Sequence, residues 1–321
     1  MSTTTSSSSS LMLTAPRTLQ WITEALPEPG SGDVIIQTTT GAISIGTELP
    51  QYLGTNRSIV PPHYPRMTGY ESVGRVVWCG AKIRGIKVGD RAVAFYGHRT
   101  QAVVPASSAI PVPDDFSDAL AILAILSCDV AKGVRRLAPM PEQPIAISGA
   151  GEIGLLTLFM LTALGCYQVD VVEPLPERRE IARRLGAHAV FAPGELMNRS
   201  DDYALGFECS SRDQAFAQLQ RLMRPQGHIC ILADGNLEPL TLTPAFHHKE
   251  LSIVGSSDGW DYHAHAAWYF HTLRRRPVPL EVLFDRQVRA ADLPATFAGL
   301  ADGSLRCLKV LVQYPDGLTG S

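Results

Sequence analysis

The sequence predicts an α/β protein made of a β-rich module and a doubly wound module with a parallel sheet. Three observations support this prediction. Short apolar runs between Gly and Pro residues fill the first third of the 321-residue chain, apolar strands and helices alternate from about residue 119, and an apolar strand runs into Gly-x-Gly-x-x-Gly at 149–154. Such alternation is typical of βαβ units around a parallel sheet.

The β-rich module is predicted from short strands separated by turn residues. Its clearest runs are 33–37, 73–78, 91–95 and 101–104. A continuous apolar stretch at 119–126 follows, and it predicts a helix that runs on toward Arg136. Residues 1–10, which are rich in Ser and Thr, are expected to form a disordered tail.

The doubly wound module is predicted from the alternation itself. The expected strands are 145–147, 169–172, 189–191, 203–208, 228–232 and 251–254. The expected helices are 155–164, 177–185 and 212–223. A helix at 262–273 and a strand at 308–313 complete the chain. We therefore expect the first module at 11–125 and 257–321, and the second at 126–256.

Composition excludes several classes of protein. The formal net charge of −3 gives no basic surplus for binding nucleic acid or an anionic membrane. The longest apolar stretch contains the glycine run, so it is interpreted as a buried strand, turn and helix. None of the six cysteines forms a Cys-x-x-Cys pair. This pattern favours the reducing cytoplasm over a disulfide framework.

The glycine run predicts a binding site for a nicotinamide dinucleotide. Gly149 allows the tight turn, Gly151 lets the backbone approach a pyrophosphate, and Gly154 lets the helix pack against the strand. The N–H groups of the new helix, which include those of Glu152 and Ile153, then face the phosphates. The alternative is a glycine-rich turn that binds no ligand.

The residues after the next two strands indicate which nucleotide binds. Glu173 follows the second strand, 19 residues after Gly154, where a carboxylate would bind the adenosine ribose. Such a carboxylate would repel a 2′-phosphate, so NAD is favoured. Arg178 lies nearby and could meet a phosphate, which keeps NADP as the alternative. Ser210, after the strand that ends at Glu208, is a further cofactor-binding candidate.

The layout and several local runs resemble the medium-chain dehydrogenase/reductase superfamily. The runs are Gly46-Thr47-Glu48, Gly69-Tyr70-Glu71-Ser72-Val73-Gly74, Val88-Gly89-Asp90-Arg91 and the glycine run. Within it, the chain resembles the 3-hydroxyethyl bacteriochlorophyllide a dehydrogenases, through runs such as Cys307-Leu308-Lys309. The resemblance implies a GroES-like catalytic domain and a Rossmann domain, and by analogy a homo-oligomer.

The resemblance also draws attention to a missing set of zinc ligands. Many members of the superfamily hold a catalytic zinc with Cys, His and a third Cys, Asp or Glu, and these positions correspond here to Ile45, Tyr70 and Ile125. Isoleucine cannot ligate zinc, and tyrosine does so rarely. We therefore expect no metal. The alternative is a site rebuilt from Cys128, Asp129, His98 or Glu71.

Without zinc, another group must handle the proton. Thr47 matches the hydroxyl that passes a proton in zinc-containing relatives, and the phenol of Tyr70 can donate or accept a hydrogen bond. We expect one of these two to orient the substrate oxygen and to relay its proton. The alternative for Tyr70 is that it only fills the volume left by zinc. Glu71 is expected to pair with a basic group, and a direct catalytic role is its alternative.

The sequence thus predicts a zinc-independent, NAD(P)-dependent oxidoreductase. It would transfer hydride between nicotinamide and a secondary alcohol or ketone, as a step in pigment or specialised metabolism. One alternative is a reductase of conjugated double bonds in enones or quinones. The other is a dinucleotide-binding protein with no catalytic activity. The expected partner is a small-molecule substrate.

Overall fold

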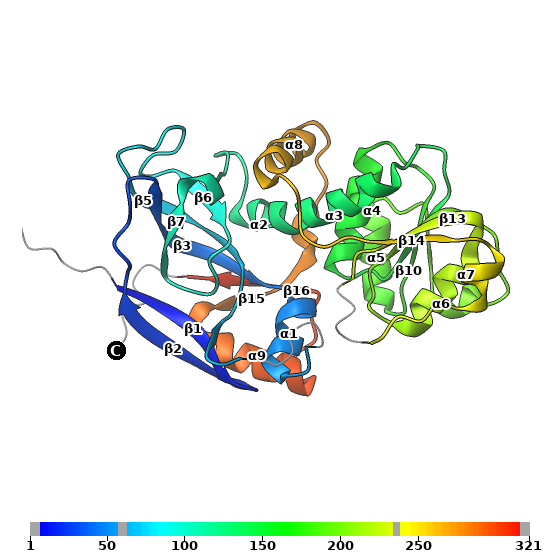
Figure 1. The fold of residues 1–321 in the computed structure, drawn as a ribbon, viewed down its shortest axis with the longest axis horizontal. Coiled ribbons are helices and arrows are strands. Elements are labelled where there is room, and N and C mark those ends of the chain that lie inside the picture. The colour runs from blue at the N-terminus through cyan, green and yellow to red at the C-terminus, as the bar shows by residue number, and fades with distance from the viewer. Residues whose placement is uncertain (1–6, 57–62, 234–237, 315–321) are drawn as a thin grey trace, which may run out of the picture. The chain divides into compact units, whose positions relative to one another are not determined.

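The computed structural model describes residues 7–56, 63–233 and 238–314 (Figure 1). The chain divides into two compact units, Met1–Leu123 with Phe284–Ser321, and Ala124–Leu283. Residues 257–283, which the sequence analysis assigned to the β-rich module, therefore fall in the second unit. The reason is that helix α8 (Tyr262–Arg275) packs against α3 (Ala124–Leu137), which also belongs to the second unit.

The first unit is built on two sheets. The larger sheet has the order β15-β16-β3-β5-β6-β8 with β7 paired to β3, and the smaller sheet has the order β2-β1-β4. The strands are β1 (Ser7–Ala15), β2 (Thr18–Ala25), β3 (Asp33–Ile43), β4 (Arg66–Met67), β5 (Glu71–Cys79), β6 (Arg91–Ala94), β7 (Gln101–Pro105), β8 (Ile110–Pro111), β15 (Phe284–Arg289) and β16 (Lys309–Gln313). The helices are α1 (Ile45–Leu53), α2 (Asp118–Ile122) and α9 (Leu293–Asp302). Side chains of β3 alternate between half-buried and buried over residues 33–40, as expected for a strand with one face in the core, and residues 41–43 are all buried.

The prediction of a disordered tail over residues 1–10 is wrong for residues 7–10. Strand β1 begins at Ser7 and pairs with β2 in antiparallel register. Ser8 donates a hydrogen bond to the carbonyl of Gln101 at 2.6 Å, and the hydroxyls of Ser9 and Thr23 are 2.7 Å apart. The serines are thus the polar end of a strand whose Leu11 is fully buried. Residues 1–6 lie outside the described residues.

The second unit is a parallel sheet with helices. Its strand order is β11-β10-β9-β12-β13-β14. The strands are β9 (Ile145–Ser148), β10 (Val169–Val172), β11 (Ala189–Phe191), β12 (Tyr203–Glu208), β13 (Met223–Ile231) and β14 (Ser252–Gly255). Besides α3 and α8, the helices are α4 (Glu152–Ala163), α5 (Pro176–Arg184), α6 (Asp213–Leu222) and α7 (Pro244–His248). The order reverses between β9 and β12, and ligands of such sheets bind at the carboxyl ends of the strands beside this point.

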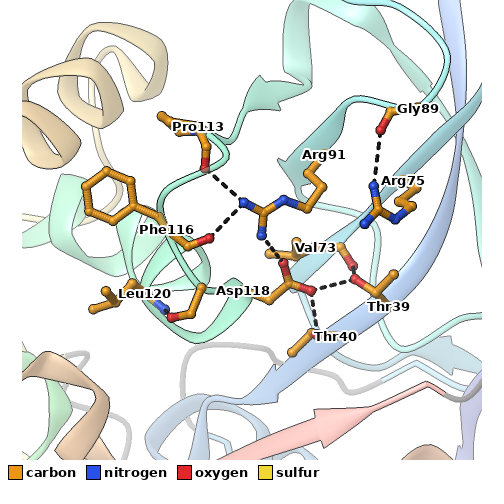
Figure 2. A network of polar contacts seen from close by, with 11 residues as sticks. Thr39, Thr40, Val73, Arg75, Gly89, Arg91, Pro113, Phe116, Asp118 and Leu120 are labelled. Carbon is orange, nitrogen blue, oxygen red and sulfur yellow. Dashed lines mark hydrogen bonds and ion pairs between the residues drawn. The ribbon is translucent and has the colours of Figure 1, made fainter.

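The helix predicted from 119 toward Arg136 is two helices, because α2 ends before Leu123 and α3 begins at Ala124. The start of α2 is held in the first unit by a polar network (Figure 2). Arg91 pairs with Asp118 at 2.8 Å and donates to the carbonyls of Pro113 and Phe116. The second oxygen of Asp118 accepts hydrogen bonds from the hydroxyls of two β3 residues, Thr39 and Thr40. The network therefore ties α2 to the central strand.

Helices α3 and α8 are joined by a buried hydrogen bond that makes a pH-dependent contribution to stability. Ser127 Oγ and His265 Nε2 are 2.9 Å apart, and burial lowers the pKa of His265 from 6.5 to about 4. The unfolded chain therefore binds this proton at a higher pH than the folded chain does. The stabilising contribution of His265 is complete above pH 6.5 and is lost as the pH falls from 6.5 toward 4.

We expect wild-type protein to lose about 3 kcal/mol more unfolding free energy between pH 7.5 and pH 4 than His265→Gln does, from a shift of this size. Urea unfolding at the two pH values measures the difference. Equal losses in the two proteins would show that His265 titrates normally in the folded chain.

Among the described residues, none of the helices combines the length and apolar character that a membrane crossing requires.

Candidate active site

The turn between β9 and α4 has the glycine geometry that the sequence predicted. Gly149 has a φ of +96°, which favours glycine, and its N–H donates to the carbonyl of Val172 at 2.8 Å. A Cβ on Gly154 would lie 2.0 Å from the carbonyl oxygen of Gly149. The first and third glycines are therefore required by the turn itself.

Gly151 is different, because nothing in the described protein requires it to be glycine. It is the N-cap of α4 with a φ of −74°, and a Cβ built on it would have no atom within 4 Å. The N–H groups of the first helical turn, which include those of Glu152 and Ile153, have no acceptor within the helix. An open backbone beside these groups is what a bound pyrophosphate needs.

This difference gives a test that separates binding from folding. We expect Gly151→Ala to weaken NADH binding by about tenfold or more, which is about 1.4 kcal/mol, because its methyl group would occupy the space of the pyrophosphate. The melting temperature should not change. Fluorescence titration and thermal unfolding measure the two quantities. Gly194→Ala is the matched control, since its Cβ is also free of contacts. Unchanged NADH affinity in Gly151→Ala would contradict a nucleotide at this turn.

Glu173 lies against the glycine turn, directly after β10. Its carboxylate accepts hydrogen bonds from the N–H of Ala150 at 2.7 Å and from that of Leu175 at 3.0 Å. A carboxylate offers about four acceptor positions, so capacity remains for ribose hydroxyls. Arg178 is half-buried in the first turns of α5. The sequence analysis missed Arg179, which donates to the carbonyls of Glu173 and Pro174 at 2.7 Å each and fixes this loop.

Ser210 also lies beside the glycine turn. A Cβ on Gly149 would be 3.1 Å from Ser210 Cβ. Both the N–H and the hydroxyl of Ser210 donate to Glu208, whose fully buried carboxylate also accepts from the N–H of Ser211. Burial raises the pKa of Glu208. Glu208 thus holds Ser210 in place, a role that the sequence analysis did not assign to it.

In the first unit, a hydroxyl pair joins the two predicted catalytic residues. The hydroxyl of Tyr70 donates to Ser44 Oγ at 2.7 Å. Ser44 is the N-cap of α1, and Thr47 in the first turn donates its N–H to the carbonyl of Ser44 at 3.1 Å. Tyr70 and Thr47 are both half-buried, whereas Ser44 is buried. Ser44 was not a sequence candidate, although it precedes Ile45 at the position of the first zinc ligand in relatives.

A buried hydrogen bond and a buried ion pair accompany this hydroxyl pair. His98 Nε2 is 3.0 Å from Glu48 Oε2. Lys309 Nζ is 2.8 Å from Glu71 Oε1, and both of these side chains are fully buried. Burial raises the pKa of Glu71, and the attraction of Lys309 opposes that shift. Glu71 has the basic partner that the sequence analysis expected for it.

Comparisons with known proteins find similar dehydrogenases. Residues 153–268 match the family model described as zinc-binding dehydrogenase. L-threonine 3-dehydrogenase of Pyrococcus horikoshii is 27% identical over 287 residues, which are 76% of this chain and 80% of that protein. A zinc-binding dehydrogenase structure from Sinorhizobium meliloti 1021, bound to NADP, has a TM-score of 0.83 at 19% identity and covers 96% of this chain and 99% of its own.

A second structural neighbour is 2R,3R-butanediol dehydrogenase of Bacillus subtilis, with a TM-score of 0.80 at 20% identity over 96% of this chain and 100% of its own. The chain is therefore similar in sequence to dehydrogenases, and the two structural neighbours share its fold. The predicted fold class, a GroES-like domain with a Rossmann domain, is confirmed by these neighbours.

The zinc named in the family description does not fit the residues of this chain. Ile45 and Ile125 have no donor atom, and the hydroxyl of Tyr70 is bonded to Ser44. Within the described residues, no three His, Cys, Asp or Glu side chains form a group that could hold a metal. Three of the residues suggested for a rebuilt site have other partners: His98 lies beside Glu48, Glu71 pairs with Lys309, and Asp129 accepts the hydroxyl of Tyr262 at 2.7 Å.

Proposed function

We propose that this enzyme is a zinc-independent, NAD(P)-dependent oxidoreductase that interconverts a secondary alcohol and its ketone. The observation that carries the proposal is the hydrogen bond between Tyr70, at one expected zinc-ligand position, and Ser44, which directly precedes another such position. The glycine turn, with its open backbone at Gly151, supports a bound nucleotide. The family match and the dehydrogenase relatives support the reaction type.

The bound nicotinamide would supply or accept the hydride. The residues of the protein would then have to orient the substrate oxygen and to transfer one proton. In the direction of ketone reduction, the Tyr70 hydroxyl would donate its proton to the carbonyl oxygen, and the Ser44 hydroxyl would turn to donate to the phenolate that remains. In alcohol oxidation the phenolate would take the proton back. Ser44 fixes the phenol through the 2.7 Å hydrogen bond. Thr47 provides a second hydroxyl on the same turn of α1 for orienting the substrate oxygen.

We propose NAD as the preferred nucleotide. Glu173 is buried against the glycine turn, and its carboxylate would oppose a 2′-phosphate by charge repulsion. Arg178 on α5 is the residue that would favour NADP instead. The structural neighbour from Sinorhizobium meliloti was solved with NADP, so a direct comparison of NADH and NADPH affinities is needed. Tighter binding of NADPH would contradict the role given to Glu173.

For the substrate, we propose a bulky secondary alcohol of pigment or specialised metabolism, such as a hydroxyethyl group on a tetrapyrrole. This finer proposal is supported by the similarity to the bacteriochlorophyllide dehydrogenases at the runs quoted above. The same proposal places the enzyme in the reducing cytoplasm, because its six cysteines are free thiols.

A substrate panel with NAD(H) and NADP(H) tests the reaction type. It should contain 2,3-butanediol, L-threonine, an aryl-substituted secondary alcohol such as 1-phenylethanol, and a set of enones and quinones. Turnover of a secondary alcohol or its ketone is the expected result. Turnover of enones or quinones alone would replace the proposal with reduction of conjugated double bonds. NADH binding with no turnover of any compound would favour a protein that only binds the nucleotide.

A further inference from the structure

His98 is a fully buried histidine that the proposed reaction does not use directly. Its Nε2 is 3.0 Å from Glu48 Oε2, and the other oxygen of Glu48 accepts the backbone N–H of Ser44 at 2.9 Å. Glu48 is itself buried, with 4% of its surface exposed. Through this carboxylate, His98 holds the N-cap of α1, which carries the acceptor of the Tyr70 hydroxyl.

The same histidine also holds the other side of the hydroxyl pair. Its backbone N–H donates to the carbonyl of Thr68 at 2.8 Å. Its ring packs on Gly69, where a Cβ would lie 2.7 Å from the ring carbons. Gly69 has a φ of +75° and directly precedes Tyr70. A side chain at position 69 would therefore displace either the imidazole or the segment that carries Tyr70.

The surroundings of the ring indicate which nitrogen carries the proton. Nε2 faces a carboxylate, whereas Nδ1 has no hydrogen-bond partner among the described residues. The ring meets Phe297 edge-on, with centroids 6.3 Å apart. A proton on Nε2 is therefore satisfied by Glu48, and a proton on Nδ1 would be buried without an acceptor. The Nε2–H group is the donor to Glu48.

We propose that His98 and Glu48 are positioning residues, which together fix both partners of the Tyr70–Ser44 hydrogen bond. This inference rests on the proposed function for its consequence in catalysis, but its geometry can be tested without a substrate. Loss of the Nε2–H donor would release Glu48, and through it the N–H of Ser44. The phenol of Tyr70, which directly precedes β5, would then lose its fixed acceptor, so its orientation would change.

The first test uses full-length enzyme labelled with 3-fluorotyrosine. The fluorine signal of Tyr70 is assigned by its loss in Tyr70→Phe. His98→Leu removes the donor at similar volume, whereas His98→Gln keeps an N–H group at the position of Nε2. We expect the Tyr70 signal to move or broaden in His98→Leu and in Glu48→Gln, and to stay in place in His98→Gln. His228→Gln, at an exposed histidine of β13, is the control that leaves it unchanged.

A Tyr70 signal that is the same in His98→Leu and Glu48→Gln as in wild type would overturn the proposal, and so would an equal change in His98→Gln. If His98→Leu does not fold, the Tyr70 signal of Glu48→Gln alone tests the proposal. The second test uses a secondary alcohol turned over in the panel. Here kcat should fall about tenfold in His98→Leu, with KM and NADH affinity unchanged, as for a misplaced catalytic group. A moved Tyr70 signal without any turnover would refute the proposed reaction and leave the positioning role intact.

Discussion

Replacing Tyr70 with Phe should lower kcat for the secondary alcohol about 100-fold, the smaller end of the range for losing a general acid–base. The substitution removes one oxygen atom and keeps the ring, so the half-buried side chain still fills its site. The hydrogen bond to Ser44 at 2.7 Å disappears, together with the proton that the substrate oxygen would exchange. Steady-state kinetics with saturating NAD at several pH values measure the effect.

The control for this prediction is Tyr167→Phe, an exposed tyrosine of the second unit, which should keep wild-type kcat. NADH affinity should be unchanged in both variants. If Tyr70→Phe retains full turnover, Tyr70 only fills volume and Thr47 becomes the candidate for the proton path. A Thr47→Val variant would then separate the two hydroxyls, because it removes the second one at nearly constant size.

Replacing Lys309 with Met should destabilise the first unit by about 3–5 kcal/mol, the cost of leaving one partner of a buried ion pair alone. Lys309 and Glu71 are both fully buried, and their charged atoms are 2.8 Å apart. Methionine has a similar length, so it leaves little empty volume, but it leaves the carboxylate of Glu71 buried without a partner of opposite charge. Chemical unfolding at pH 7, followed by a probe in the first unit, measures the loss.

Two further variants serve as controls for this prediction. Pairing Lys309→Met with Glu71→Gln should recover part of the lost stability, because no bare charge remains buried. Arg183→Met breaks an exposed ion pair with Glu180 on α5 and should cost less than about 1 kcal/mol. A loss in Lys309→Met as small as that in Arg183→Met would show that the Glu71 carboxyl is neutral in the folded protein.

The fold could be predicted from sequence where patterns are local. Strands β9 and β10 are short apolar runs followed by Gly or an acidic residue, and the glycine turn between β9 and α4 has a fixed spacing. Strand β1 was missed because its first residues are serines, and only pairing with β2 and contacts to β7 show that they form a strand. The break at Leu123 was missed because no Pro or Gly marks it.

The candidate site also contains residues that the sequence could predict and residues that it could not. The glycine turn and Glu173 follow a motif with fixed spacing, so their positions could be predicted from the sequence alone. His98 and Glu48 are 50 residues apart, and Lys309 is 238 residues from Glu71. No periodicity connects residues at such separations, and the Lys309–Glu71 pair is formed by the register of β16 and β5 on the two sides of β3. Ser44 has a local signal, because a serine before a helix commonly caps it.

We propose that this enzyme works with the Tyr70–Ser44 hydroxyl pair and without a bound zinc ion. Metal analysis and turnover measured on one purified sample test it most directly. We expect zinc well below one ion per chain, and turnover of the secondary alcohol that is unchanged after treatment with a chelator. One zinc ion per chain, with activity that is lost on chelation and restored by added zinc, would contradict the account.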